Sequence, residues 1–189
     1  MISFLLPPVL GALAGALASI VYNWWRTDKE YRALILSFSA EFISQFELCV
    51  MYFGHSMETY VSFSTLFSFT DASAFSKLAS VSRDPEVPAA IIELKANYFQ
   101  IQPHIEEASK YALEASRASE EPERRKRMTD AAFLAQRVAM TFFLSELAET
   151  ESLTALLLNN AQRVSPGPVA WDLNSRFSKA KKQIKKLRS

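Results

Sequence analysis

Apolar side chains recur at three- and four-residue steps along most of this chain, and that period is typical of amphipathic helices. Residues 27–57 contain no proline and carry the first such stripe. Its members are Leu34, Phe38, Phe42, Ile43, Phe46, Val50 and Phe53. Gly54 follows at a position suited to the end of a helix. The pattern predicts one long helix that continues from the segment before it.

Two further long helices are predicted. Residues 84–88 combine two prolines with two carboxylates, which suits the first turn of a helix. That helix should run to about residue 118 and be bent or interrupted at Pro103. A third stripe, which includes Val138, Phe142 and Leu147, predicts one helix from about residue 123 to 161. Residues 58–83 have a mixed pattern and are predicted as short helices and loop.

The chain begins with a long segment that lacks charged side chains. As a helix, Ile2–Trp25 is about 36 Å long, which is enough to cross the hydrocarbon core of a membrane with some tilt. The aromatic residues Tyr22, Trp24 and Trp25 end this segment, and the basic residues Arg26, Lys29 and Arg32 follow it. Because no basic side chain precedes the span, we expect the N-terminus outside and the soluble domain in the cytoplasm.

A secretory signal peptide cleaved after Ala18 is the alternative, because residues 16–18 have the small-x-small pattern of a cleavage site. Two features favour a retained anchor. The start lacks a basic side chain, and the apolar run continues past Ala18 to Trp25. In the alternative, the mature chain is an exported helical protein that binds an apolar ligand between its aromatic-rich helices.

Gly11, Gly15 and Ser19 recur at every fourth residue of the predicted span. Small residues at this spacing let a second helix approach closely within a membrane. They predict helix packing, with a second copy of the chain or another protein as the partner. Glycine is also frequent in membrane helices that contact lipid alone.

The C-terminal segment differs sharply in charge from the rest. Residues 171–189 carry a net charge of +6, whereas residues 1–170 carry −5. Basic side chains flank a narrow apolar face, and this arrangement suits a membrane surface or an acidic partner. The residues expected to make that contact are Arg176, Lys179, Lys182, Lys185 and Lys186. A solvated helix is the structural alternative, and nucleic acid is disfavoured because arginine and aromatic residues are few.

Composition agrees with an all-α fold. Apolar residues make up 49% of the chain and only four residues are glycine, which argues against disorder and against a turn-rich β-sandwich. We expect a transmembrane anchor over residues 1–25 and a small cytoplasmic helical bundle with long, partly kinked helices over 26–162. A Pro/Gly loop over 163–170 and a basic amphipathic helix over 171–189 should follow.

Candidate chemistry is sparse. No segment matches a phosphate-binding loop, a nucleophile elbow or a zinc motif. The lone Cys49 lies in an apolar stretch and is expected to be buried. We therefore expect neither catalytic residues nor a cofactor or metal. The leading hypothesis is a single-pass membrane protein that acts through protein or membrane contact, as a scaffold, sensor or membrane-acting effector, and that can oligomerise.

Overall fold

The computed structural model describes residues 6–54, 72–82, 84–118 and 120–188, with the backbone alone for 6–13, 187 and 188. Every regular element in these residues is an α-helix, which confirms the predicted fold class. The helices are α1 (Leu6–Gly54), α2 (Ala72–Val81), α3 (Glu86–Arg117), α4 (Pro122–Ser145), α5 (Leu147–Val164) and α6 (Pro168–Arg188). Most of the mixed segment 58–83, up to residue 71, lies outside the described residues.

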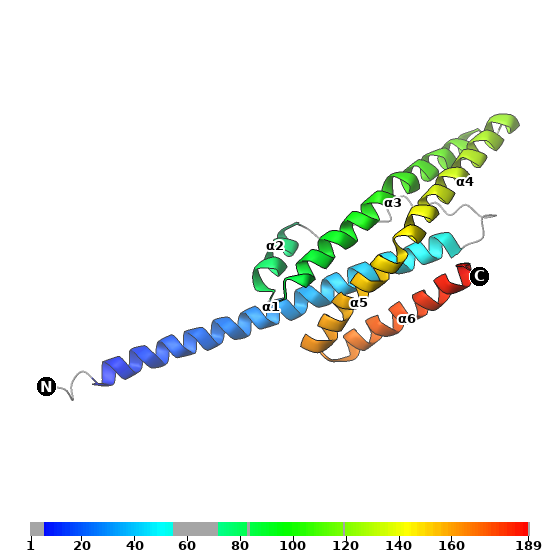
Figure 1. The fold of residues 1–189 in the computed structure, drawn as a ribbon. Helices are drawn as coiled ribbons and strands as arrows, with labels where there is room; N and C mark the ends of the chain where they lie inside the picture. Colours follow the sequence, from blue (N-terminus) through cyan, green and yellow to red (C-terminus); the bar gives the residue numbers. More distant parts are fainter. Residues whose placement is uncertain (1–5, 55–71, 83, 119, 189) are drawn as a thin grey trace.

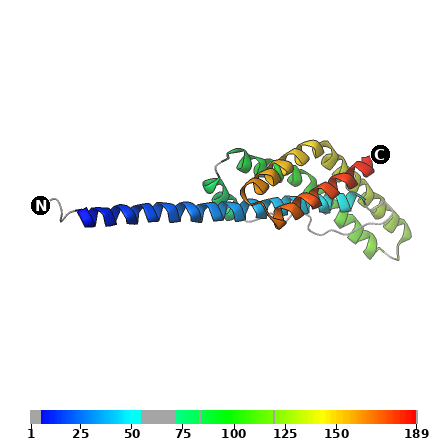
Figure 2. The same ribbon diagram turned by 90° about the horizontal axis from the view of Figure 1, so that it is seen from below.

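The long helix α1 is the central helix of the molecule. Its first half extends away from the other helices, and its second half lies among them (Figures 1 and 2). The first buried side chain in the described part of α1 is Tyr31, and Phe38, Phe42 and Phe46 of the predicted stripe are fully buried. Leu34 and Phe53, at the two ends of the stripe, are partly buried against the core. The predicted continuation from the uncharged segment into the bundle is confirmed, and α1 is helical up to Gly54, the last described residue before 72.

Helices α3 and α4 form an antiparallel hairpin whose joined ends project from the rest of the bundle (Figures 1 and 2). The predicted extent of α3 is confirmed, but the helix is not interrupted at Pro103. Buried alanines line the hairpin seam, among them Ala108, Ala115, Ala132 and Ala139. These small side chains let the two backbones pack closely over a long contact.

The prediction of one helix from 123 to 161 is wrong, because the chain bends by 58° between α4 and α5. The bend lies at Glu146, where the Ser145 hydroxyl donates to the Phe142 carbonyl oxygen at 2.7 Å. A serine hydroxyl that bonds back to the preceding turn favours a bend. Leu147 then turns into the core. The predicted core position of Phe142 is also wrong, since Phe142 is 39% exposed and Phe143 is 1% exposed.

Helix α6 belongs to the bundle rather than to a separate tail. Its apolar face is buried, with Leu173, Phe177, Ala180 and Ile184 in the common core. Only residues 165–167 separate it from α5, so the connection is shorter than the expected loop over 163–170. Helix α6 runs in the same direction as α1, and the C-terminus lies beside the far end of α1 (Figure 1).

Candidate membrane anchor and interaction surfaces

The projecting half of α1 is apolar and uncovered. Residues 14–27 are all exposed, and Leu17, Ile20 and Val21 each expose more than 60% of their surface, at 62%, 64% and 63%. A helix that carries large apolar side chains outside any protein core is typical of a membrane span. Helix α1 is long and apolar enough to cross a membrane, although a signal sequence meets the same test.

The small-residue face of this helix is open in the part that the structure describes. A Cβ atom built on Gly15 would meet no other side chain or distant backbone within 4 Å, and Ser19 is exposed. Gly11 lies in α1, but its surroundings are outside the described side chains. A partner helix can therefore reach Gly15 and Ser19 without displacing any described part of this chain.

Charged side chains begin directly after Trp25. The Lys29 Nζ atom lies 3.8 Å from the centroid of the Trp25 ring, a geometry that favours a cation–π contact. The Glu30 carboxylate accepts from Arg26 Nε at 3.3 Å and lies 3.5 Å from Lys77 Nζ of α2. These contacts lower the pKa of Glu30, chiefly through the hydrogen bond from Arg26. Glu30 therefore joins α2 to α1 where α1 leaves the bundle.

Of the basic residues predicted on α6, Arg176 has a partner within the chain. Its guanidinium forms an ion pair with Glu47 of α1, and it also donates to the Ser44 hydroxyl at 3.1 Å. The hydrogen bonds that Arg176 donates to the Glu47 carboxylate raise the pKa of Arg176. Arg176 thus contacts an acidic residue of its own bundle, and this contact positions α6 against α1.

The lysines of α6 lie far from the projecting half of α1. Lys179, Lys182, Lys185 and Lys186 are exposed and follow Arg176 toward the end of the bundle that is distant from the N-terminus (Figure 1). Glu47, which pairs with Arg176, is roughly 22 residues beyond Trp25 on one helix, or about 33 Å at the helical rise. Sequence reasoning missed this separation because it depends on the direction of α6.

The α3–α4 hairpin carries an apolar surface that the sequence analysis did not identify. Leu134 and Phe142 of α4 are exposed, and the Phe142 ring stacks on His104 of α3 with centroids 4.9 Å apart. Beside them, the Tyr111 hydroxyl donates to Glu107 at 3.1 Å. His104 is thus a packing residue at a partly exposed surface; His55 lies outside the described residues.

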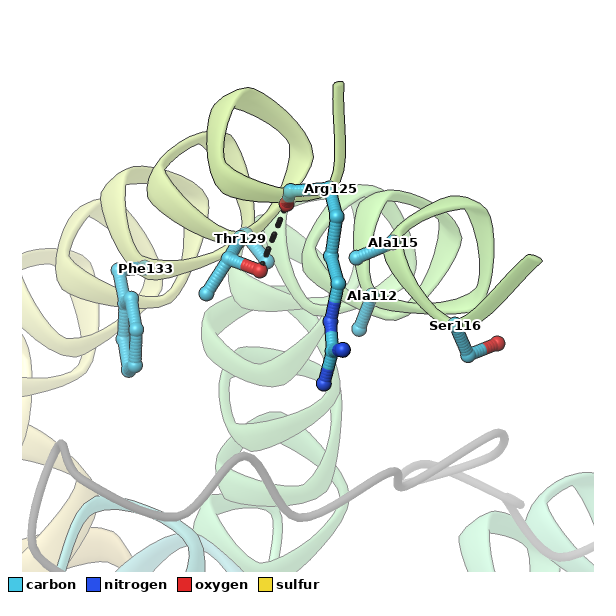
Figure 3. Close-up of a pocket in the computed structure, with 7 residues that line it drawn as sticks. Ala112, Ala115, Ser116, Arg125, Thr129 and Phe133 are labelled. Atoms are coloured by element: carbon cyan, nitrogen blue, oxygen red, sulfur yellow. Dashed lines mark hydrogen bonds between the residues drawn. The ribbon is translucent and has the colours of Figure 1, made fainter. Parts of the chain in front are cut away.

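A small cavity of about 210 Å³ lies nearer the hairpin end. Alanines from both helices form its walls, and the Arg125 side chain crosses it beside Ala112 (Figure 3). The Thr129 hydroxyl donates to the Arg125 carbonyl oxygen at 2.9 Å and holds this turn of α4. Phe133 closes one side. The cavity is large enough for a small side chain or a short apolar group.

The lone cysteine of the chain lies where it is a poor nucleophile. Cys49 is fully buried, as predicted, and burial raises the pKa of its thiol far above the usual range. Such a thiol is a poor nucleophile because the reactive form is the thiolate. Among the residues that the structure describes, no three His, Cys, Asp or Glu side chains gather in a group that could hold a metal ion.

Comparison of the chain with protein-family models, with curated proteins and with solved structures gives no match.

Proposed function

We propose that this chain is a single-pass membrane protein whose helical bundle acts as an interaction module held at the membrane by α1. The observation that carries the proposal is the division of one continuous helix into two environments. Residues 14–27 are exposed, while the stripe from Ile35 to Val50 is buried in the core. A helix shared by an anchor and a core fixes the bundle relative to the membrane normal.

Cleavage after Ala18 is less well supported. The mature chain would begin at Ser19 and keep Ile20, Val21, Trp24 and Trp25 on a projecting helix, where they are now exposed. Those side chains would remain in water, which is unfavourable for apolar surface. The proposed apolar ligand would also find the space between the aromatic helices filled, because Phe42, Phe46 and Tyr98 are fully buried there.

The anchor is tested by deleting residues 1–25 and by sequencing the N-terminus of the full chain from membranes. We expect the full chain to resist extraction with alkaline carbonate and to keep its N-terminal segment. The deletion variant should move to the soluble fraction while retaining its helical circular dichroism. Membrane retention of the deletion variant, or a mature chain that starts at Ser19, would contradict the proposal.

The proposed orientation places the bundle in the cytoplasm. It is supported by the basic residues Arg26, Lys29 and Arg32, which follow the span. Cysteine labelling of intact cells tests it: a cysteine at Ser178 should react with a membrane-impermeant maleimide only after lysis. Reaction in intact cells would mean that the bundle lies outside the cytoplasm, and it would not contradict the membrane anchor.

Three surfaces are proposed to make contacts. The open face at Gly15 and Ser19 is suited to a second copy of the chain or another membrane helix. Leu134 and Phe142 on the hairpin are suited to a protein partner. The α6 lysines are better suited to an acidic partner than to the membrane that holds α1. In the proposed span they lie about 33 Å or more from the membrane interface at Trp25. This distance is far beyond the length of about 8 Å over which salt screens electrostatic attraction.

The self-association proposal is tested by Gly15→Leu, which places a bulky side chain on the open face. We expect this variant to lose crosslinking between copies in the membrane, whereas Leu17→Ala, on another face of the same helix, should keep it. Equal crosslinking of both variants would show that this face does not pack against a second copy.

A further inference from the structure

Four basic side chains from two separate helices lie around α1 where it leaves the bundle. Arg26, Lys29 and Arg32 come from α1, and Lys77 comes from α2; we call these four residues the basic collar. Lys77 is distant in sequence from the other three and reaches the collar because its ammonium group lies 3.5 Å from Glu30 of α1. Helix α2 thus adds a cation that the sequence pattern after Trp25 does not contain.

The collar lies at the height of lipid headgroups if Trp25 marks the membrane interface. Arg32, the farthest of its α1 residues, is about 10 Å beyond Trp25 along the helix. The headgroup region is about 5–7 Å thick on each side of the hydrocarbon core. Long basic side chains extend several ångströms toward it. The contact between Lys29 and the Trp25 ring places one ammonium group directly at this boundary.

The basic collar has a net positive charge, and its side chains are exposed to solvent. Arg26 and Lys77 pair with Glu30 and Arg32 pairs with Asp28, so the four cations together with these two carboxylates carry a net charge of +2. The side chains of Arg26, Arg32 and Lys77 are 64%, 49% and 53% exposed. Ion pairs this exposed to water are weak, so an arginine or lysine can exchange a carboxylate contact for a phosphate oxygen.

We infer that the basic collar binds the headgroup phosphates of anionic phospholipids, and that α2 is docked on α1 so that Lys77 completes the site. This inference rests on the proposed membrane span. It assigns the lipid contact to the collar rather than to the α6 lysines, which carry more charge but lie too far from the interface. It also gives α2 a role, since its single buried side chain among the described residues is Leu78.

The experiment uses the full chain with Trp171→Phe, so that Trp24 and Trp25 are the remaining tryptophans. The protein is reconstituted in phosphatidylcholine vesicles that contain the same mole fraction of brominated phosphatidylglycerol or brominated phosphatidylcholine. Bromine quenches tryptophan at short range and therefore reports which lipid lies next to the collar. We expect phosphatidylglycerol to be enriched by at least about fivefold, because each basic side chain near an anionic surface contributes about that factor.

Matched variants separate the contribution of the basic collar from that of the α6 lysines. Arg26→Gln/Lys29→Gln/Lys77→Gln should abolish the enrichment, whereas Lys179→Gln/Lys182→Gln/Lys185→Gln, which removes the same charge, should leave it unchanged. Lys77→Gln alone should reduce the enrichment, and Lys77→Arg should preserve it. Circular dichroism confirms that each variant is folded. A Lys77→Gln variant with full enrichment would overturn the role of α2.

The outcomes also separate this inference from the proposed function. If neither brominated lipid quenches Trp24 and Trp25, the membrane span itself is wrong. If both lipids quench equally in the parent chain, the span stands and the collar does not select anionic lipid. If the variant with three α6 lysines replaced loses the enrichment and the collar variant keeps it, the lipid site lies on α6 and the inference is overturned.

Discussion

At the residue scale, aromatic side chains of α1 connect the other helices. The Phe46 ring lies 5.9 Å from Phe143 of α4 and 5.4 Å from Phe177 of α6, between centroids. One turn earlier, Phe42 stacks on Tyr98 of α3 at 6.2 Å. Aromatic pairs in such arrangements add to the stabilisation from buried area. A few aromatic contacts therefore hold α1 against the other helices.

The neighbours Phe142 and Phe143 give a direct test of this packing. Phe143→Ala should lower the free energy of unfolding by about 3–5 kcal/mol, because it leaves a cavity beside Phe46. Phe142→Ala removes a half-exposed ring that stacks on His104 and should cost less than about 1 kcal/mol. Urea unfolding of the detergent-solubilised chain, followed by circular dichroism, measures both. Equal losses would contradict the orientation of α4.

Cys49 gives a prediction on pH. Burial raises the pKa of the thiol in the folded chain, so the folded state keeps its proton at a pH where the unfolded chain loses it. Above the ordinary thiol pKa of about 8.5, the unfolded state binds fewer protons and the free energy of unfolding falls as pH rises.

Urea unfolding between pH 7 and pH 9.5 measures this dependence. The parent chain should lose stability above about pH 8.5, and Cys49→Ala should flatten the decline. The thiol should also react with a maleimide no faster than the protein unfolds. Fast modification under native conditions would place Cys49 outside the core.

At the element scale, the bend between α4 and α5 is set by tertiary packing together with a serine. Residues 123–161 contain neither proline nor glycine, so their local preference is for one straight helix. The bend lets Leu147 and Leu157 enter the α1 core, while the buried Asn97 amide reaches Thr150 at 3.4 Å. Apolar burial outweighs the loss of a few regular helical contacts.

Spin labels at Lys126 and Asn159 measure the bend, in a chain whose Cys49 is replaced by alanine. A straight helix would separate these positions by about 50 Å. With the observed bend of 58°, the distance should be shorter by about 6 Å at the same helical rise. Pulsed electron resonance resolves this difference, and a distance near 50 Å would mean that α4 and α5 form one straight helix in solution.

The elements differ in how far the sequence predicts them. The start of α3 follows from a local signal, namely Asp84 and Pro85 directly before Glu86. The bend at Glu146 and the burial of Phe143 in place of Phe142 depend on neighbouring helices, and no local pattern encodes them. The same holds for the collar, because the contact of Lys77 with Glu30 arises only when α2 docks on α1.

At the scale of the whole molecule, the continuous course of α1 sets which surfaces would lie near a membrane that it spans. One helix passes from the exposed segment into the core, and Glu30, Glu47 and Gly54 mark increasing heights along it. A typical tilt of about 20° shortens these heights by less than a tenth. In the proposed span, the collar is therefore expected beside the lipid, whereas the α6 lysines lie at the opposite end of the bundle.

Two exposed serines at different heights test this arrangement. Ser76 precedes Lys77 on α2, and Ser178 follows Arg176 on α6. Each is replaced by cysteine in a chain with Cys49→Ala, labelled with a fluorophore and reconstituted with lipids that carry a nitroxide on the headgroup. We expect strong quenching at position 76 and almost none at position 178, because Arg176 pairs with Glu47 about 33 Å beyond Trp25.

The quenching at positions 76 and 178 together defines the orientation of the bundle. Quenching at both positions would mean that α1 lies along the membrane surface and that the α6 lysines contact the same bilayer. Quenching at position 178 alone would place α6, rather than α2, at the interface. Because the collar and the α6 lysines lie at opposite ends of one bundle, an upright α1 that brings the collar to the lipid directs Lys179, Lys182 and Lys185 away from the membrane.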